Sequence, residues 1–417
     1  MIKKPRGTED IIGQKSRDFF ALEMIIRNLM ELYNIGEIKT PIFESSDLFA
    51  RTAGEDTDIV SKEMFIFLDR KNRSLALRPE NTAGVVRSLI ENKNYLDENL
   101  PLKQFYFGPM FRYERPQAGR QRQFTQFGVE VFGQKSVSLD AEILLCAVDI
   151  LNNIGLKNYI IKTNYLVFGT NKEEYLKVLK LHLKALKLCE DCQIRQKNNP
   201  LRVLDCKVDQ SNFGDIPNMQ DFLSEDEKKY FQDYTNILNK LGVSTIVDNH
   251  LVRGLDYYTG IVFEVISNDE KQGSQSTLLA GGRYDNLVSE LGGPELSGAG
   301  FGMGIERILI ALDNLEIKIS EPSILDVFCI PLSESAEIFT NSLLLMLRKA
   351  GFTADTSYIK RSLKSNFKKA ESFKANNIIL IGDKELKENN VVIKNQKTMK
   401  ETKVSFDKIL EFLEEGI

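Results

Sequence analysis

The chain has 417 residues, of which 42% are hydrophobic and 27% charged, and its formal net charge is −4. This balance is typical of a folded protein of roughly two or three domains and excludes a histone-like polycation, so any nucleic-acid binding must come from local basic patches. The N-terminus has no secretory signal, and no apolar run reaches the roughly 18 residues of a membrane span. Together with five unevenly spaced cysteines, these features predict a cytoplasmic protein without a membrane partner.

The first hundred residues predict a helix followed by short strands. Apolar residues recur at helical spacing between residues 17 and 32, namely Phe20, Met24, Leu29 and Leu32. The following IKTPIFE is expected to be extended and broken by Pro41. Two strands around a turn at 71–73 and a helix over 81–92 come next.

Residues 104–132 predict a long antiparallel hairpin, because apolar alternating runs flank a polar loop. The block from about 166 to 242 is rich in Lys, Leu and Glu, so we expect a mostly helical insertion there. Strands are expected again at 251–266 and 276–288, and a glycine-rich strand leads into a helix over 298–315.

A pause in the pattern near 317–322 indicates a linker. Beyond it, strands and helices alternate, with Gly351 at the C′ position of one helix. We therefore expect two domains, residues 1–320 and an α/β domain at 325–417.

Several common chemistries are excluded by motif. The P-loop pattern is absent, and the glycines of GAGFGMG do not complete G-x-G-x-x-G. His182 and His250 are the only histidines, and neither lies in H-E-x-x-H or beside a G-x-S-x-G serine. Histidine-based hydrolysis and zinc-protease chemistry are therefore not predicted.

The sequence CEDC contains Cys189 and Cys192, which together with Cys206 and His182 could supply three sulfurs and one nitrogen to zinc. The spacing of these residues is loose. We expect instead that the cysteines are reduced thiols packed in the helical insertion, with no protein-ligated metal.

The hairpin loop is unusually rich in arginine, with four in residues 112–123. Alternation places Arg112 and Glu114 on one face, shared with Gln126 and Glu130, while Phe127, Val129 and Val131 face the core. Guanidinium beside carboxylate suits a ligand with both signs of charge, such as an amino acid together with a nucleotide. Alternatively, these charges are only solvated and paired with each other.

Residues in other segments favour a ligand-binding site over charges that are only solvated. Glu80 and Thr82 lie at an expected helix start. LVRGLDYYTG would carry Arg253 on a strand, and Arg307 falls in the first turns of a helix. Arginines from separate segments are costly to hold together without an anion between them, and a triphosphate would serve all of them.

Taken together, TPIFE, LRPENTAG, FGPMFRYERPQAGRQRQFTQFGVEVFG, LVRGLDYYTG, AGGRYDNL and GFGMGIERIL closely resemble the class II histidyl-tRNA synthetases, with similarity from end to end. The resemblance implies an α+β fold: an antiparallel catalytic sheet flanked by helices, a helical insertion and a C-terminal α/β anticodon-binding domain. It also implies a homodimer formed around Pro41. The expected reaction is ATP-dependent ligation of L-histidine to tRNA(His) through histidyl-adenylate, with AMP and pyrophosphate released and Mg²⁺ accompanying ATP.

The resemblance also implies roles for individual residues. Three would be catalytic: Arg112, Arg253 and Gln126. ATP would be held by Arg112, Arg120, Phe124, Arg253 and Arg307. Histidine would be held by Glu80, Asn81, Thr82, Arg112, Gln126, Glu130, Arg253, Tyr257, Tyr258 and Tyr284. Arg115 and Gln117 would face the tRNA acceptor end, whereas Arg122 receives no partner.

Three positions depart from the family pattern. Asn81 replaces a glycine and would tolerate a positive φ. Ala280 replaces the first glycine of GGGRYD and adds a methyl group near the expected histidine pocket, and residues 163–169 also differ from the usual segment.

Two further expectations concern the whole protein and its C-terminal domain. A non-catalytic paralogue, such as a regulatory subunit of ATP phosphoribosyltransferase, is the alternative function, but such paralogues usually lack the anticodon-binding domain and part of the arginine set. The basic run 360–374 is either a solvated helix face or an RNA-backbone contact through Lys364 and Lys368.

Overall fold

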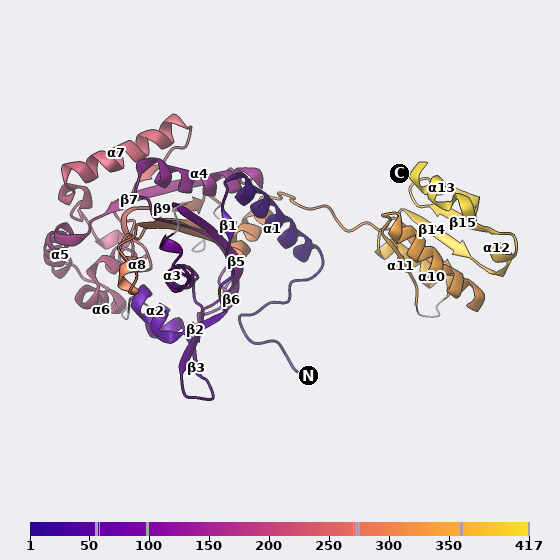
Figure 1. The fold of residues 1–417 in the computed structure, drawn as a ribbon, viewed down its shortest axis with the longest axis horizontal. Coiled ribbons are helices and arrows are strands. Elements are labelled where there is room, and N and C mark those ends of the chain that lie inside the picture. The colour runs from indigo at the N-terminus through magenta and orange to yellow at the C-terminus, as the bar shows by residue number, and fades with distance from the viewer. Residues whose placement is uncertain are drawn as a thin grey trace. The chain divides into compact units, whose positions relative to one another are not determined.

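A computed structural model describes residues 1–54, 57, 59–96, 100–269, 271, 276–358 and 362–415. The chain divides into two compact units, Met1–Ser320 and Glu321–Ile417. Each unit has its own sheet and hydrophobic core (Figure 1). Among the described residues, no helix combines the length and apolar character needed to cross a bilayer.

The first unit is built on a large sheet whose described strands follow the order β1-β5-β6-β11-β10-β9-β7-β8. All inner pairs are antiparallel, and only the two-residue edge strands β1 and β8 pair in parallel. The α+β class and the predicted antiparallel sheet are thus confirmed, with a mixed pattern at the edges. The strands are β1 (Gly36–Glu37), β5 (Leu102–Phe111), β6 (Gln123–Phe132), β7 (Tyr159–Leu166), β8 (Ile246–Val247), β9 (Thr259–Ser267), β10 (Thr277–Arg283) and β11 (Gly298–Gly304).

The two faces of this sheet differ as the alternation predicts. Phe127, Val129 and Val131 of β6 are buried in the main core. The opposite face of β6 carries Gln126 and Glu130 and opens into a pocket. The helices of the first unit are α1 (Gln14–Leu32), α2 (Ser46–Ala53), α3 (Thr82–Glu91), α4 (Val137–Asn153), α5 (Gly169–Lys184), α6 (Glu190–Asn198), α7 (Glu225–Lys240), α8 (Leu287–Glu290) and α9 (Ile305–Asn314).

Helix α1 exists where it was predicted, but its buried face is different. Phe20 and Leu32 are 64% and 82% exposed, and the residues that enter the core are Leu22, Ile26, Leu29 and Met30. A helix this rich in apolar residues offers two possible stripes, and packing against α4 decides between them.

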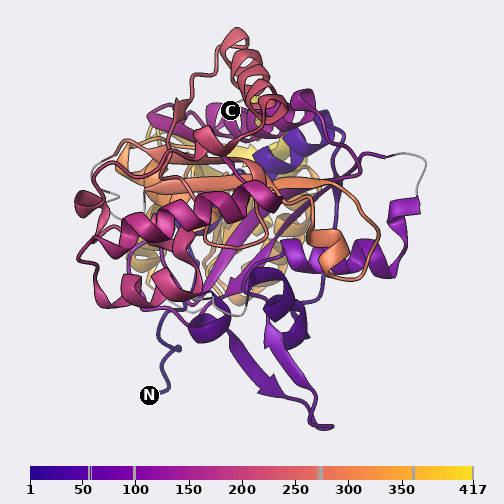
Figure 2. The ribbon, with the colours of Figure 1, turned by 90° about the vertical axis from the view of Figure 1, so that its left-hand side faces the viewer.

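A second, three-stranded sheet protrudes from the first unit, as both ribbon views show (Figures 1 and 2). It has the order β2-β4-β3. Its strands are β2 (Phe43–Ser45), β3 (Phe65–Leu68) and β4 (Ser74–Leu77). The two strands predicted around the turn at 71–73 are β3 and β4.

The insertion is mainly helical, as expected, with α5, α6 and α7 joined by short 3₁₀ turns such as η3 (Pro200–Val203). The strand predicted over 251–266, however, begins only at Thr259. Arg253, Asp256 and Tyr257 lie in an irregular turn before β9. Their placement on a strand was therefore wrong, because Gly254 and Asp256 favour a turn over the apolar alternation.

The second unit has a sheet of order β13-β12-β14-β15-β16, in which the first two pairings are parallel and the last two antiparallel. Gly351 follows α10 with φ +90°, a conformation that favours glycine. The elements are β12 (Val327–Pro331), α10 (Glu334–Lys349), β13 (Ala354–Thr356), α11 (Leu363–Ser372), β14 (Asn377–Ile381), α12 (Asp383–Lys387), β15 (Asn390–Asn395), β16 (Glu401–Ser405) and α13 (Ile409–Glu415).

Candidate active site

The polar face of the large sheet forms the floor of a pocket. On β6 this floor carries Gln126, Gly128 and Glu130, and the neighbouring β11 places Gly304, Gly302 and Gly300 opposite them. A Cβ atom on Gly300 would lie 2.3 Å from Oε2 of Glu130 and 2.9 Å from the Tyr284 hydroxyl. The glycines of GAGFGMG therefore keep the floor free of side chains, and Gly300 leaves room for the Glu130 carboxylate and the Tyr284 hydroxyl.

Glu130 lies at the centre of a buried hydrogen-bond cluster. Its Oε1 accepts a 2.6 Å hydrogen bond from the Thr82 hydroxyl, and its Oε2 accepts one from the Tyr284 hydroxyl. Burial raises the pKa of Glu130 to about 8, although both hydroxyl donors favour the ionised form. The carboxylate is thus held in one orientation, and its charge is only weakly compensated.

Glu80 is held just before helix α3. Its carboxylate accepts hydrogen bonds from the backbone N–H groups of Thr82, at 2.7 Å, and Ala83, at 3.0 Å. These are groups that a helix start leaves without helical partners. Burial raises the pKa of Glu80, although these N–H donors favour its ionised form. A second buried carboxylate therefore lines the pocket that contains Glu130.

Four arginines line the same pocket: Arg112, Arg120, Arg253 and Arg307. Arg307 donates to the carbonyl oxygens of Gly119 at 3.1 Å and Thr277 at 3.0 Å. Burial, together with the charges of Arg112 and Arg120, lowers its pKa to about 10. Mutual repulsion of this kind is relieved when an anion binds between the guanidinium groups.

Arg112 and Arg253, which both line the pocket, differ in their hydrogen bonds. Arg112 Nε donates to Pro79 O at 2.9 Å, and its guanidinium lies 5.3 Å from the centre of the Phe124 ring. Within the described chain, Arg253 Nε is buried without a hydrogen-bond partner. An unsatisfied buried donor is costly, so a ligand that accepts from it would be stabilised.

Comparison with known proteins identifies the family of this chain. A family model described as histidyl-tRNA synthetase matches residues 7–168 and 210–308, and one described as an anticodon binding domain matches 326–416. The histidine–tRNA ligase of Mesoplasma florum is 46% identical over 416 residues, covering 99% of this chain and 90% of the relative. This chain belongs to the histidyl-tRNA synthetase family.

Solved structures of the family agree. The apo histidyl-tRNA synthetase of Staphylococcus aureus superposes with a TM-score of 0.84 at 38% identity, covering 99% of this chain and 100% of that one. A Bacillus halodurans structure described as an ATP phosphoribosyltransferase regulatory subunit/histidyl-tRNA synthetase is 20% identical, with a TM-score of 0.67, and shares the fold. The family resemblance and the synthetase fold inferred from the motifs are confirmed.

Most of the synthetase residues singled out by sequence line this pocket. They are Glu80, Thr82, Arg112, Arg120, Phe124, Gln126, Glu130, Arg253, Tyr257, Tyr258, Tyr284 and Arg307. Ala280 lines the pocket as well.

Asn81 is not among the lining residues. Its Oδ1 accepts hydrogen bonds from Thr40, at 2.5 Å, and Arg78, at 3.3 Å. Its φ is −120°, so the turn does not require the positive φ that asparagine was expected to tolerate.

The arginine loop separates into parts with different surroundings. β5 ends at Phe111, so Arg112 and Glu114 belong to the loop and not to the strand. Arg115 and Gln117 are exposed, and Gln117 pairs with Arg120 across a tight turn. Glu114 is buried and forms an ion pair with Arg120.

Arg122, to which the sequence assigned no partner, contacts two other residues in the structure. Its guanidinium lies 3.8 Å from the centre of the Tyr113 ring, and its backbone N–H donates to Gly7 O at 2.7 Å. Arg122 therefore fastens the loop to the N-terminal segment, and it does not line the pocket.

Tyr106 and Glu306 are among the lining residues that the sequence reasoning missed. Tyr106 pairs with Gly128 across β5 and β6, and its hydroxyl donates to Gln126 Oε1 at 3.2 Å. Glu306 accepts hydrogen bonds from Thr125 N at 2.8 and 3.0 Å. Strand parity would have found Tyr106, because it shares the polar face once the hairpin register is known.

Proposed function

We propose that this chain ligates L-histidine to tRNA(His) in two steps, with ATP consumed and AMP and pyrophosphate released. The observation that carries the proposal is a single pocket lined by four arginines and by buried carboxylates, among them Glu80 and Glu130. Histidine needs acceptors for its ammonium and imidazole N–H groups. ATP needs cations for its phosphates, and the same pocket offers both.

In the first step the histidine carboxylate attacks the α-phosphate of ATP, and pyrophosphate leaves. Negative charge develops on the phosphoryl oxygens, where Arg112 and Arg253 are the proposed donors. Preorganised donors in a site shielded from water contribute on the order of 3 kcal/mol each. The attacking carboxylate is already ionised near neutral pH, so no protein base is needed.

We assign the remaining lining residues to the two substrates. Glu80, Thr82 and Gln126 would hold the ammonium group, whereas Glu130 and Tyr258 would read the imidazole nitrogens. A neutral imidazole has one donor and one acceptor nitrogen, which a carboxylate and a phenol satisfy together. An amino acid without this pair leaves buried groups unsatisfied, which gives strong discrimination.

ATP is proposed to bind with its adenine against Phe124 and its outer phosphates near Arg120 and Arg307. Mg²⁺ enters with ATP as part of the substrate. Carboxylate oxygens such as those of Glu114 and Glu306 on the pocket wall are ligands that Mg²⁺ accepts alongside phosphates.

The tRNA is proposed to contact both units. Arg115 and Gln117 would meet the acceptor end, and the match of 326–416 to an anticodon-binding domain supports a second contact there. On α11, Lys364 and Lys368 are exposed, one helical turn apart, while Asn366 and Ala370 are buried. Lys360 and Arg361, which begin the basic run, lie outside the described residues.

We also propose a cytoplasmic homodimer that associates through the region around Pro41. Exposed apolar side chains gather beside this residue and on the protruding sheet, where the Phe43 and Phe67 rings lie 6.4 Å apart. Such a patch is typical of an interface. The exposed residues are Ile42, Phe43, Ile66, Phe67 and Leu68.

Aminoacylation of total tRNA with each amino acid in turn tests the function directly. Histidine alone should be incorporated, and incorporation of another amino acid would contradict the assignment. The regulatory-subunit alternative is not favoured, because relatives at 42–46% identity over nearly the whole chain are histidine–tRNA ligases. The regulatory-subunit alternative predicts that no amino acid is incorporated into tRNA.

A further inference from the structure

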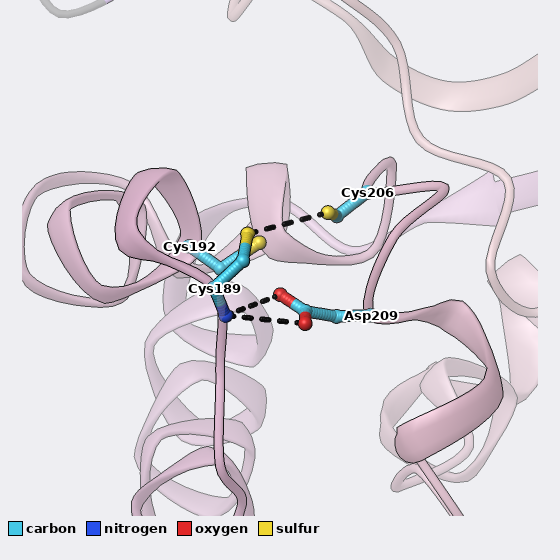
Figure 3. A group of neighbouring side chains, drawn as sticks. All are labelled: Cys189, Cys192, Cys206 and Asp209. Atoms are coloured by element: carbon cyan, nitrogen blue, oxygen red, sulfur yellow. Dashed lines mark hydrogen bonds between the residues drawn. The ribbon is translucent and has the colours of Figure 1, made fainter.

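Four metal-ligating side chains meet in the helical insertion: Cys189, Cys192, Cys206 and Asp209 (Figure 3). Their ligand atoms all lie within 4.8 Å of one another. Cys189 immediately precedes α6 and Cys192 lies in its first turn, whereas Cys206 and Asp209 follow η3. The cluster therefore joins two segments of the insertion.

The sulfur geometry fits a tetrahedral metal. Sγ of Cys189 and Sγ of Cys206 are 3.8 Å apart. Two thiolates on a tetrahedral Zn²⁺ with Zn–S bonds of about 2.3 Å are separated by about 3.8 Å. A disulfide needs about 2.05 Å, and all the cysteines are free.

Asp209 adds a second indication of a cation. Its side chain is 2% exposed, and its two oxygens accept from the backbone N–H of Cys189 at 3.1 and 3.0 Å. The carboxylate thus lies beside three sulfur atoms, and once the thiols lose their protons this buried group of negative charges needs a cation.

His182 is not part of this cluster. Its Nε2 lies 2.8 Å from the carbonyl oxygen of Phe213. The set of three sulfurs and one nitrogen considered from the sequence is therefore replaced by three sulfurs and one carboxylate oxygen, in the spacing C-x₂-C and C-x₂-D.

We propose that Cys189, Cys192, Cys206 and Asp209 bind one structural Zn²⁺. Soft thiolates with one carboxylate suit Zn²⁺, and four protein ligands close the site to substrate. Binding releases the three thiol protons to solvent. All four ligands lie in residues 169–209, between the two segments that the family model matches.

The site would stabilise the wall of the active-site pocket. Between the two ligand pairs, Asn199 Nδ2 donates to Asp256 Oδ1 at 2.9 Å and Arg202 Nη1 donates to Arg253 O at 2.9 Å. Zn²⁺ would close the segment 192–206 and so hold both donors against the turn that carries Arg253. The metal would thus affect substrate binding by positioning the turn that carries Arg253, without itself contacting the substrate.

Metal analysis of the purified full chain tests the site. After expression with added zinc and exhaustive dialysis, wild type should retain about one Zn²⁺ per chain. The variant C189S/C206S should retain less than a tenth of this amount. C146S/C329S, which alters two buried cysteines elsewhere, should match wild type. Zinc-free wild type, or equal zinc in C189S/C206S, would overturn the proposal.

A second measurement covers the case in which C189S/C206S does not fold. Wild type stripped by a chelator and loaded with Co²⁺ should show visible bands of tetrahedral Co²⁺ and thiolate charge-transfer absorption, and D209N should shift the visible bands. Octahedral Co²⁺ without thiolate absorption would overturn the site. Zinc should also raise the melting temperature of stripped wild type, and an unchanged melting temperature would contradict a structural role.

Discussion

Thr82 and Glu130 are 48 positions apart in the chain and are joined by a 2.6 Å hydrogen bond from the Thr82 hydroxyl to Oε1 of Glu130. The bond connects the first residue of α3 to the floor strand β6. Tyr284 holds the other oxygen of the same carboxylate. These two hydrogen bonds orient Glu130 before a ligand arrives. Each carboxylate oxygen can still accept a further hydrogen bond from a ligand.

Glu130→Gln should weaken histidine recognition specifically. The amide keeps the shape of the side chain but cannot carry the negative charge that accepts from an imidazole N–H, and wild-type Glu130 carries this charge above its pKa of about 8. A hydrogen bond to a charged group contributes about 1.5–3 kcal/mol, so the KM for histidine should rise about 10- to 100-fold while the KM for ATP changes little. Steady-state ATP–pyrophosphate exchange measures both constants. An unchanged histidine KM would remove Glu130 from the histidine site.

The same variant should become more stable relative to wild type as the pH rises. The folded-state pKa of Glu130 is raised from 4.5 to about 8. Between these values the folded state binds more protons than the unfolded state, so this group contributes stability at low pH that is lost as the pH rises toward 8. Urea unfolding at pH 5.5 and 8.5 measures the difference between Glu130→Gln and wild type. It should grow by up to about 1.4 kcal/mol per pH unit below pH 8, and a constant difference would contradict the raised pKa.

Arg307→Lys and Arg122→Lys form a matched pair from the arginine set. Lysine at 307 cannot reproduce the two hydrogen bonds to Gly119 and Thr277 and still present a planar cation to phosphate. Exchange activity should fall by about 10²- to 10³-fold. Arg122→Lys loses its stacking on Tyr113, which costs about 1 kcal/mol of stability, with activity nearly unchanged. Equal activity losses in the two variants would contradict the assignment of Arg307 to phosphate binding and of Arg122 to loop structure.

The double variant Lys364→Glu/Lys368→Glu should weaken tRNA binding and leave pyrophosphate exchange intact, because both lysines lie on α11 in the second unit. The control Lys384→Glu/Lys387→Glu makes the same charge change on α12. Filter binding of tRNA and pyrophosphate exchange are measured for both. Equal weakening by the control would indicate a general charge effect and not a specific face.

Strand alternation predicted the essential part of the pocket, because the period of two separates Gln126 and Glu130 from Phe127 and Val129 without any tertiary information. It did not show that residues 253–257 form an irregular turn, because the apolar residues on either side suit a strand, whereas Gly254 and Asp256 within the segment favour a turn. The role of Arg122 was also invisible, because Gly7 and Tyr113 reach it only through the fold. Asn81 shows a related limit: its partner Thr40 lies 41 positions away, so a departure from the family pattern gave no sign that Asn81 bonds to Thr40 and does not line the pocket.

The most direct test of the account is histidine-dependent ATP–pyrophosphate exchange with active-site-titrated protein and each of the standard amino acids in parallel. The account predicts rapid exchange with histidine and exchange at background level with the others. Background exchange with histidine as well, in protein that binds ATP, would contradict the assignment of this pocket to histidine activation.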